Sequence, residues 1–447
     1  MKRILILLYC LLPILLYGQS ALSALDNMHQ VARGETWEII AYDHGVSVAE
    51  LQAANPDVFG KKLKKGSWLI IPKASQPANS QDSLPSSSSP KPTPNLSPAR
   101  TSIPNLNVGI LLPFADGKMV EFYRGLLMAA DSIRKDAKVN LDIHAWDCGT
   151  SVSQIEALLP QLSGLDIIFG PASSSQMPIV AENCREQGTR LVLPFWNGQA
   201  SLDYPLVYSA TAPIGVFFDT AVKKMLSFFS NKNYVIVHTG NSDDRAATLC
   251  ETLSKELSLR SVLPRKLELE GDEFAYETAF NQFRENMIVL DDSNIRSLNI
   301  LLSHLKDFRQ KHPEYRLSLI GFPEWQNETQ WLLPDLYAFD SYIISPYYYN
   351  VLDERTKSFQ RAYEKCFHTP IGHNNPRQAA YGFDLGCYFL GGISSLGDTF
   401  EQNQGNVPQE PYQSPFRFER SATGMSFTNR FVQFIHYTPE GSIELIR

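Results

Sequence analysis

Cysteine and histidine are sparse in this sequence of 447 residues, which holds six of the first and nine of the second. No CxxC, HExxH or His-x-x-x-His spacing occurs. Protein metal sites draw their ligands from such closely spaced residues, so we expect no metal site and no bound cofactor. The cysteines beyond residue 24 are odd in number and scattered along the chain, which implies no disulfide framework.

An excess of positive charge is also absent, because the formal net charge is -7. A protein surface that contacts nucleic-acid phosphates must be basic. We therefore exclude nucleic acid as a partner.

The sequence lacks the short motifs of common catalytic sites. No Walker A or Rossmann glycine run occurs, and "GPASSS" at 170–175 is not the GxSxG elbow of serine hydrolases. The pairs Asp243-Asp244 and Asp291-Asp292 are neighbours in the sequence, and we expect their side chains to face solvent separately. Catalytic carboxylate pairs need a defined separation across a cleft. We therefore expect no catalytic residue and no enzymatic activity.

The N-terminus carries the pattern of an export signal. Residues 1–3 (MKR) are positively charged, residues 4–16 are apolar, and "YGQSALSA" offers small residues for cleavage. The apolar run is too short for a permanent membrane span. We predict a cleavable signal peptide over residues 1–24. Lipid attachment at Cys10 is the alternative, which the bulky Tyr9 disfavours.

A break in composition divides the rest of the chain. Residues 74–104 are almost wholly serine, proline and small polar residues. Such a segment cannot bury enough apolar surface to fold, so we predict a disordered linker. It separates a short module, residues 25–73, from a long domain, residues 105–447.

The short module reads as strand, helix, helix, strand. "MHQVA" and "SWLIIP" are the strand patterns, "TWEIIAYDHG" predicts the first helix, and a second helix runs from Ser47 to about Ala54. This order, together with the segments GET (34–36), GVS (45–47), ANP (54–56) and IP (71–72), resembles the lysin motif (LysM), a small βααβ module.

The resemblance implies binding to glycans that contain N-acetylglucosamine, which for an exported bacterial protein means peptidoglycan. The implied groove lies between two short segments, formed by Gly34, Glu35, Thr36 and Trp37 on one side and by Asn55, Pro56, Asp57 and Val58 on the other. The alternative is that Gly34, Asn55 and Pro56 build turns and that Trp37 belongs to the core.

Strand and helix patterns alternate through residues 105–447, which is typical of parallel sheets. The alternation restarts near Pro213, so we predict two α/β lobes, each with a doubly wound parallel sheet. The opening "VGILLPF", the segments "GPASSS" and "LVLPF", and the late helix pattern "AAYGFDLGCYFL" (379–390) stand in the order of a known family. This domain resembles the type I periplasmic binding proteins, in their leucine/isoleucine/valine-binding branch.

The predicted lobes are discontinuous in the sequence. Lobe 1 comprises about 105–212 and 346–410, and lobe 2 about 213–345 and 411–447. In the family a small solute binds between lobes that close on hinges. Ligands of open α/β sheets gather where strands end, so we expect solute contacts in the loops after the strands. The candidate residues are Ser173, Ser174, Ser175, Trp196 and Asn197 in lobe 1, and Asn241, Asp243, Trp325 and Tyr347 in lobe 2.

The alternative for the three serines is that they are helix caps and turn residues. One departure from the family weighs against an amino-acid site. Amino-acid binders of this branch offer serine or threonine after the fourth strand, whereas this sequence has Phe195-Trp196-Asn197 there.

The sequence thus predicts a non-enzymatic, exported, periplasmic protein associated with the cell wall. We expect it to bind peptidoglycan through its LysM module and to bind a small polar solute or an envelope protein through its bilobed domain, as a sensor or adaptor. The alternative is the substrate-binding receptor of an ABC-type amino-acid or peptide transporter, working with a membrane permease.

Overall fold

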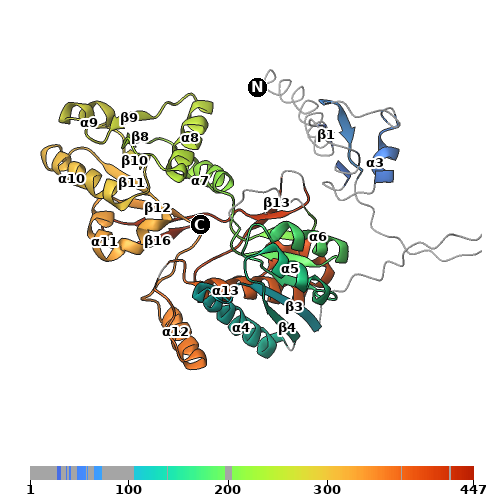
Figure 1. Ribbon diagram of the computed structural model, residues 1–447. Coiled ribbons are helices and arrows are strands. Elements are labelled where there is room, and N and C mark those ends of the chain that lie inside the picture. The colour runs from blue at the N-terminus through green and yellow to red at the C-terminus, as the bar shows by residue number, and fades with distance from the viewer. Residues whose placement is uncertain are drawn as a thin grey trace, which may run out of the picture. The chain divides into compact units, whose positions relative to one another are not determined.

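The computed structural model describes residues 28–31, 37, 40–41, 48–56, 58, 65–72, 105–137, 139–196, 204–373, 375–421 and 424–447. The predicted signal peptide and linker lie outside the described residues, as do Gly34, Glu35, Thr36, Asp57 and Asn197. The chain forms two compact units, Met1–Asn95 and Leu96–Arg447 (Figure 1). In the described part of the chain, no helix combines the length and the apolar composition that crossing a bilayer requires.

The first unit contains a two-stranded antiparallel sheet. Strand β1 (Met28–Gln30) pairs with β2 (Trp68–Ile70), and helix α3 (Val48–Ala54) lies between them in sequence. Trp37, Ile40 and Ala41 also have helical conformation. The core consists of apolar side chains from each of these parts, Val31, Ile40, Ala41, Leu51 and Leu69, all of them buried. The predicted order of strand, helix, helix and strand is confirmed.

The second unit contains two sheets, each of seven strands among the described residues. In the first lobe the spatial order is β13-β14-β7-β6-β5-β3-β4. Six strands are mutually parallel: β3 (Asn105–Leu112), β4 (Asn140–Asp147), β5 (Ile167–Phe169), β6 (Arg190–Leu193), β7 (Val207–Ser209) and β14 (Phe427–Asn429).

Helices cover both faces of the first sheet. Alternate residues of β3 point to opposite faces because successive side chains in a strand do so. Val108 and Ile110 join the core cluster of α4 (Gly117–Ala137) and α13 (Gln378–Gly386). Leu111 joins the cluster of α5 (Val152–Leu158) and α6 (Met177–Gln187) on the other face.

The second lobe repeats this plan, with the spatial order β16-β15-β12-β11-β10-β8-β9. Its parallel strands are β8 (Asn233–His238), β9 (Arg265–Glu268), β10 (Asn286–Leu290), β11 (Leu317–Gly321) and β12 (Ser341–Ser345). Strands β15 (Gln433–Tyr437) and β16 (Ile443–Ile446) add an antiparallel edge. The helices are α7 (Ile214–Phe228), α8 (Asp244–Leu259), α9 (Glu273–Ala279), α10 (Ile295–Lys311) and α11 (Thr329–Ala338). The predicted bilobed α/β fold with two mainly parallel sheets is confirmed.

Further helices follow β12. They are α12 (Glu354–Phe367), α14 (Gly392–Leu396) and α15 (Phe400–Asn403). From α15, Glu401 reaches back to the first sheet, where it forms a two-point ion pair with Arg190 (2.7 and 3.1 Å) and accepts a hydrogen bond from the Tyr208 hydroxyl (3.0 Å). This buried contact fastens the late segment to lobe 1.

The predicted division between the lobes is wrong at one point. Residues 411–447 were predicted to belong to lobe 2. Strands β13 (Phe418–Arg420) and β14 (Phe427–Asn429) belong to the first sheet instead. Strand β14 pairs with β7, and the Phe427 ring stacks on Tyr208 with centroids 4.6 Å apart. The chain therefore enters lobe 2 for the last time after Asn429.

Candidate functional site

The loop after β5 carries the three predicted serines. Ser173 Oγ donates a hydrogen bond to the Thr150 carbonyl (3.2 Å) and lies 2.9 Å from Ser175 Oγ. Ser174 is exposed. The residue that precedes α6 is Gln176, so none of the serines is the N-cap of this helix. The hydroxyl group of Ser173 instead joins this loop to the loop after β4, and Ser175 lies within hydrogen-bond distance of that hydroxyl group.

Gln176 is a buried residue of this loop and was not among the predicted site residues. Its amide nitrogen donates to the carbonyls of Cys148 and Ser151, both at 2.8 Å. Its amide oxygen is buried and has no partner among the described residues. The glutamine holds the two strand-end loops of lobe 1 together.

Trp196 follows β6 and belongs to the core. Its side chain is 7% exposed and lies in the same cluster as Cys148 and Met177. Contacts with the core therefore cover most of the indole surface. The next predicted residue, Asn197, lies outside the described residues.

In lobe 2, Ser293 brings two predicted residues together. Asp243 is the N-cap of α8 and accepts hydrogen bonds from the Arg245 and Ala246 amides (both 2.9 Å). Its second oxygen accepts from Ser293 N (2.5 Å), and the Ser293 carbonyl accepts from Trp325 Nε1 (3.1 Å). Burial opposes ionisation of Asp243, but these amide hydrogen bonds outweigh it and hold the pKa of its carboxyl below the usual value.

The other predicted residues of lobe 2 differ in exposure. Trp325 is 0% exposed, so in this structure it has no surface on which a solute could rest. Tyr347 is half-buried near the ion pair between Arg245 and Glu324, and burial raises the pKa of its hydroxyl. Asn241 is exposed.

The acidic pair Asp291-Asp292 was expected to face solvent, and this is wrong. Both side chains are buried. Asp291 accepts hydrogen bonds from the amide and hydroxyl of Thr239 (both 2.9 Å) and lies 3.0 Å from His238 Nδ1. Asp292 accepts from Asn294 N (3.0 Å). Their position directly after a buried strand was the signal that could have indicated this role.

In the LysM module, the Asn55 side chain is fully used within the fold. Its amide nitrogen donates to the carbonyls of Leu51 (2.7 Å) and Ile70 (2.8 Å), and its oxygen accepts from Ile70 N (2.7 Å). Trp37 and Val58 are half-buried against the module core. Pro56 is exposed beside them.

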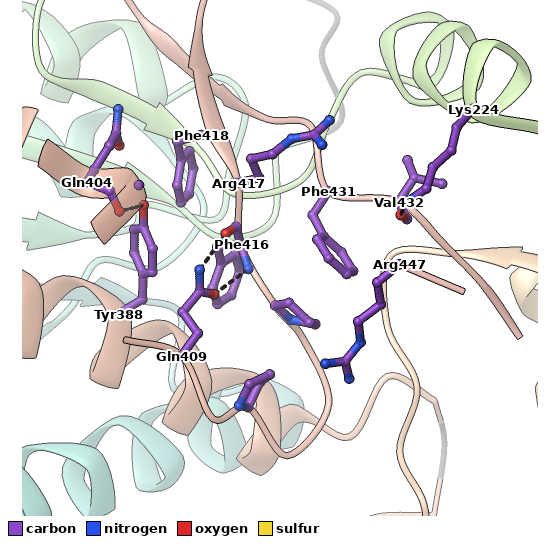
Figure 2. A pocket seen from close by; sticks show the side chains of 13 residues that line it. Lys224, Tyr388, Gln404, Gln409, Phe416, Arg417, Phe418, Phe431, Val432 and Arg447 are labelled. Carbon is purple, nitrogen blue, oxygen red and sulfur yellow. Dashed lines mark hydrogen bonds between the residues drawn. The ribbon is translucent and has the colours of Figure 1, made fainter. Parts of the chain in front are cut away.

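A cavity of about 330 Å³ lies where segments of both lobes meet. Figure 2 shows it between aromatic rings of Phe416 and Phe431 and the cationic side chains of Lys224 and Arg447. Lys224 Nζ donates to the Val432 carbonyl (2.9 Å), and its pKa is lowered by burial and by the nearby Arg417. The lining residues are too far apart in sequence for a pattern to have predicted this cavity.

Three described side chains could together hold a cation. The ligating atoms of Glu273, Glu277 and His312 lie within 4.8 Å of one another. All three sit at the surface or near it, and the Glu273 carboxylate already pairs with Lys311 and with His312 Nε2 (3.0 Å). These hydrogen bonds lower the pKa of Glu273.

Sequence comparison identifies the first unit. Residues 29–72 match the LysM domain family. They are a LysM domain. The match spans β1, α3 and β2, so the family and the observed fold agree. No curated protein matches the chain in sequence.

Solved structures identify the fold of the second unit. A branched-chain amino acid ABC transporter protein from Rhodospirillum rubrum is 13% identical, with a TM-score of 0.54, and the alignment covers 76% of this chain and 100% of that one. Full-length LpoA from Haemophilus influenzae is 11% identical, with a TM-score of 0.49, over 78% of this chain and 59% of that one. The second unit has the fold of the type I periplasmic binding proteins. At these identities the likeness concerns the fold alone.

Proposed function

We propose that this protein is a non-enzymatic binding protein of the bacterial periplasm that is held at the cell wall. Its LysM domain binds peptidoglycan, and its bilobed domain senses a small polar solute or docks an envelope protein. The observation that carries this proposal is the combination of a LysM domain with a type I periplasmic-binding-protein fold in one chain.

In the LysM part, we propose that the groove runs between residues 34–37 and 55–58. The structure supports different roles for the residues of this groove. The side-chain amide of Asn55 already forms hydrogen bonds inside the fold, so its role is to position the loop 55–58. Exposed Pro56 and the half-buried ring of Trp37 are available for sugar contacts.

In the bilobed part, we propose that a solute contacts the loops after β5, β6, β8 and β12. Ser174 and Asn241 have exposed side chains in these loops, and Tyr347 is partly exposed. The exposed groups are polar and uncharged, which suits a polar solute that accepts and donates hydrogen bonds.

The alternative function is the substrate-binding receptor of an ABC-type transporter for amino acids or peptides. The shared fold with the Rhodospirillum rubrum protein favours it. The sequence Phe195-Trp196-Asn197 disfavours amino acids, since it offers no hydroxyl group directly after β6.

Sedimentation with purified, insoluble peptidoglycan tests the proposal. We expect the full chain to sediment and a chain that lacks residues 25–73 to stay in the supernatant. Sedimentation that does not depend on residues 25–73 would contradict the assignment of wall binding to the LysM domain.

A further inference from the structure

Large apolar side chains are exposed at one edge of the second lobe. Leu263 is 79% exposed, Phe283 is 86% exposed, and neighbouring connections carry similar residues. We call this set the apolar edge: Phe228, Leu259, Val262, Leu263 and Phe283. Soluble proteins rarely gather such residues without a binding role.

The sheet topology places the apolar edge at one end of the lobe. Its residues lie at the ends of α7 and α8 or in the connections that follow α8 and α9, so they belong to the three passages that lead into β8, β9 and β10. These strands are parallel neighbours in the order β10-β8-β9, so all three connections arrive at the same edge of the sheet. Arg260 Nη1 donates to the Leu226 carbonyl (3.0 Å) and joins the ends of α8 and α7.

Hydrogen bonds hold the turn that carries Phe283. Asn281 Oδ1 accepts from the Phe283 and Arg284 amides at 2.8 and 3.0 Å. The buried Asn286 Oδ1 accepts from Asn281 N (2.7 Å) and from Asn233 Nδ2 (2.8 Å). The Phe283 ring is therefore presented by a preorganised turn, which lowers the entropic cost of binding.

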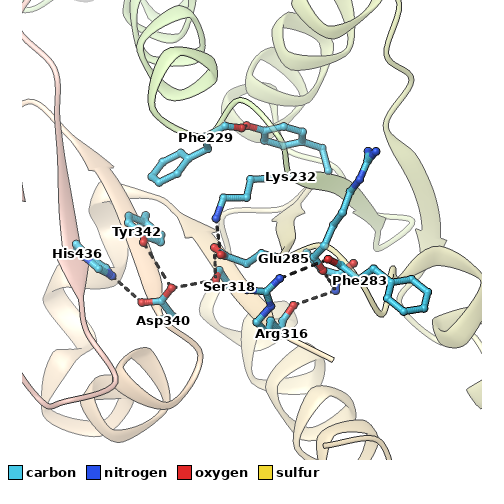
Figure 3. A network of polar contacts seen from close by, with 12 residues as sticks. Phe229, Lys232, Phe283, Glu285, Arg316, Ser318, Asp340, Tyr342 and His436 are labelled. Atoms are coloured by element: carbon cyan, nitrogen blue, oxygen red, sulfur yellow. Dashed lines mark hydrogen bonds and ion pairs between the residues drawn. The ribbon is translucent and has the colours of Figure 1, made fainter. Parts of the chain in front are cut away.

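A polar network lies beside this turn (Figure 3). Lys232 pairs with Glu285, and Ser318 bridges Glu285 and Asp340 (3.2 and 3.1 Å). In Figure 3 the Phe283 ring points away from these carboxylates. Lys232 and Glu285 neutralise each other, and further arginines lie in or next to the connections that carry the apolar edge.

The apolar edge is bordered by positive charge although the chain as a whole is acidic. Arg260, Arg265 and Arg284 are exposed, and within the described ranges none of them forms an ion pair. Guanidinium groups bind carboxylates with two parallel hydrogen bonds. Aromatic residues and arginine are also enriched in protein interfaces, whereas lysine is depleted there.

We propose that the apolar edge of lobe 2 is a docking site for an acidic segment of a protein partner that presents aliphatic or aromatic side chains between its carboxylates. This inference rests on the proposed adaptor function and gives it a location. A second copy of this chain fits poorly, because two basic edges repel each other.

Site-specific photocross-linking in the native cell envelope tests this inference. The full chain carries p-benzoylphenylalanine in place of Phe283 or, as the matched control, in place of Phe274. Phe274 is 73% exposed but lies in the first turn of α9. This turn follows the carboxyl end of β9, whereas the apolar edge lies at the amino ends of the strands. We expect one protein to be linked through residue 283 and not through residue 274, with an acidic, apolar segment at the point of linkage.

A synthetic peptide of the linked segment then gives the affinity. Phe283→Ser and Arg284→Glu should each weaken binding by about tenfold or more, while Phe274→Ser should leave it unchanged. Binding should also weaken when NaCl is raised from about 50 mM to about 500 mM. Unchanged melting curves would show that these exposed substitutions leave the fold intact.

Four results would overturn the inference. They are equal linkage from both positions, no linkage from either, dimers that Phe283→Ser abolishes, and Phe283-dependent binding to phosphatidylglycerol vesicles. Sedimentation of Phe283→Ser with peptidoglycan is measured in parallel. Its retention separates a failure of the docking site from a failure of the wall-binding function.

Discussion

Asp384 is a buried carboxyl group whose ionisation opposes folding. It lies in α13 and accepts hydrogen bonds from three consecutive amides, those of Tyr412 (2.8 Å), Gln413 (2.9 Å) and Ser414 (2.8 Å). Burial raises its pKa from 3.8 to about 7, and the three amide hydrogen bonds only partly offset this effect. The carboxyl group thus anchors the chain that returns from α15 to β13.

Replacing Asp384 should change how stability depends on pH. Between about pH 4 and pH 7 the folded chain keeps a proton on Asp384 that the unfolded chain releases. The contribution of Asp384 to the free energy of unfolding therefore falls as pH rises through this window and is constant above it. Asp384→Asn cannot ionise, so the urea midpoint of this variant should fall less steeply from pH 4 to pH 7 than that of the wild type.

A substitution of the exposed Asp307 to asparagine is the matched control for this experiment. It should leave the slope of the pH profile unchanged. Equal slopes for Asp384→Asn and the wild type would show that Asp384 is already ionised in the fold at pH 4.

Residue roles were harder to predict from sequence than residue positions. The segment "AAYGFDLG" contains Asp384, but the amide partners of this residue lie about 30 residues later, so no local pattern revealed its role. Asp291 was misjudged for the same reason, because its partners His238 and Thr239 lie at the end of another strand, β8. The solute and glycan contacts remain predictions.

Helices α4 and α13 approach each other closely because glycines line their contact. A Cβ atom on Gly125 would lie 2.0 Å from the Ala379 carbonyl oxygen, and one on Gly382 would lie 2.1 Å from that of Phe122. The helices run side by side in Figure 1, although more than 240 residues separate them in sequence. Only glycine, which has no side chain, allows the two helix backbones to come this close.

Gly125→Ala should therefore destabilise the bilobed unit. The added methyl group meets a backbone atom that cannot rotate away, so the helices must separate, at a cost of about 1–3 kcal/mol or more. Gly117→Ala, in the same helix, is the control because nothing lies within 4 Å of its Cβ position. The melting temperature should drop for the first variant and stay close to the wild type for the second. Equal melting temperatures would mean that α4 and α13 can move apart at no cost.

The sequence predicted which elements exist and in what order. It did not always predict the sheet to which a strand belongs. The apolar run "VGILLPF" (108–114) indicated β3 within a few residues of its observed ends, because buried parallel strands are short apolar runs between helices. Strands β13 and β14 were assigned to the wrong lobe. Strand β13 pairs with β14, and β14 pairs with β7, which lies more than 200 residues earlier; no local signal identifies a pairing at that distance.

At the scale of the whole molecule, the proposed function assigns a separate binding role to the LysM domain and to the bilobed domain. In the proposed function, the LysM domain keeps the protein at the cell wall, and the bilobed domain binds the solute or partner to which the protein responds. The apolar edge lies at the amino ends of the lobe 2 strands, whereas the proposed solute loops lie at their carboxyl ends. A solute and a docked protein therefore need not compete, which is what a sensor that reports to a partner requires.

A solute that binds the bilobed domain should raise the melting temperature of the full chain. At a ligand concentration about one hundredfold above Kd, the fold gains about 2.7 kcal/mol. For a domain of this size, such a gain corresponds to a rise of a few degrees. We would screen amino acids, short peptides, muropeptides and nucleosides by differential scanning fluorimetry.

Variants then locate the site of any solute that raises the melting temperature. Ser174→Ala and Asn241→Ala alter exposed side chains and should weaken binding in the proposed loops without unfolding the protein. Trp196 is unsuitable for this purpose because its indole belongs to the core.

Lys224→Gln, with the adjacent exposed Lys223→Gln as control, reports on the cavity between the lobes. If no solute shifts the melting curve while the apolar edge still binds its partner segment, the receptor function is excluded and the adaptor function stands.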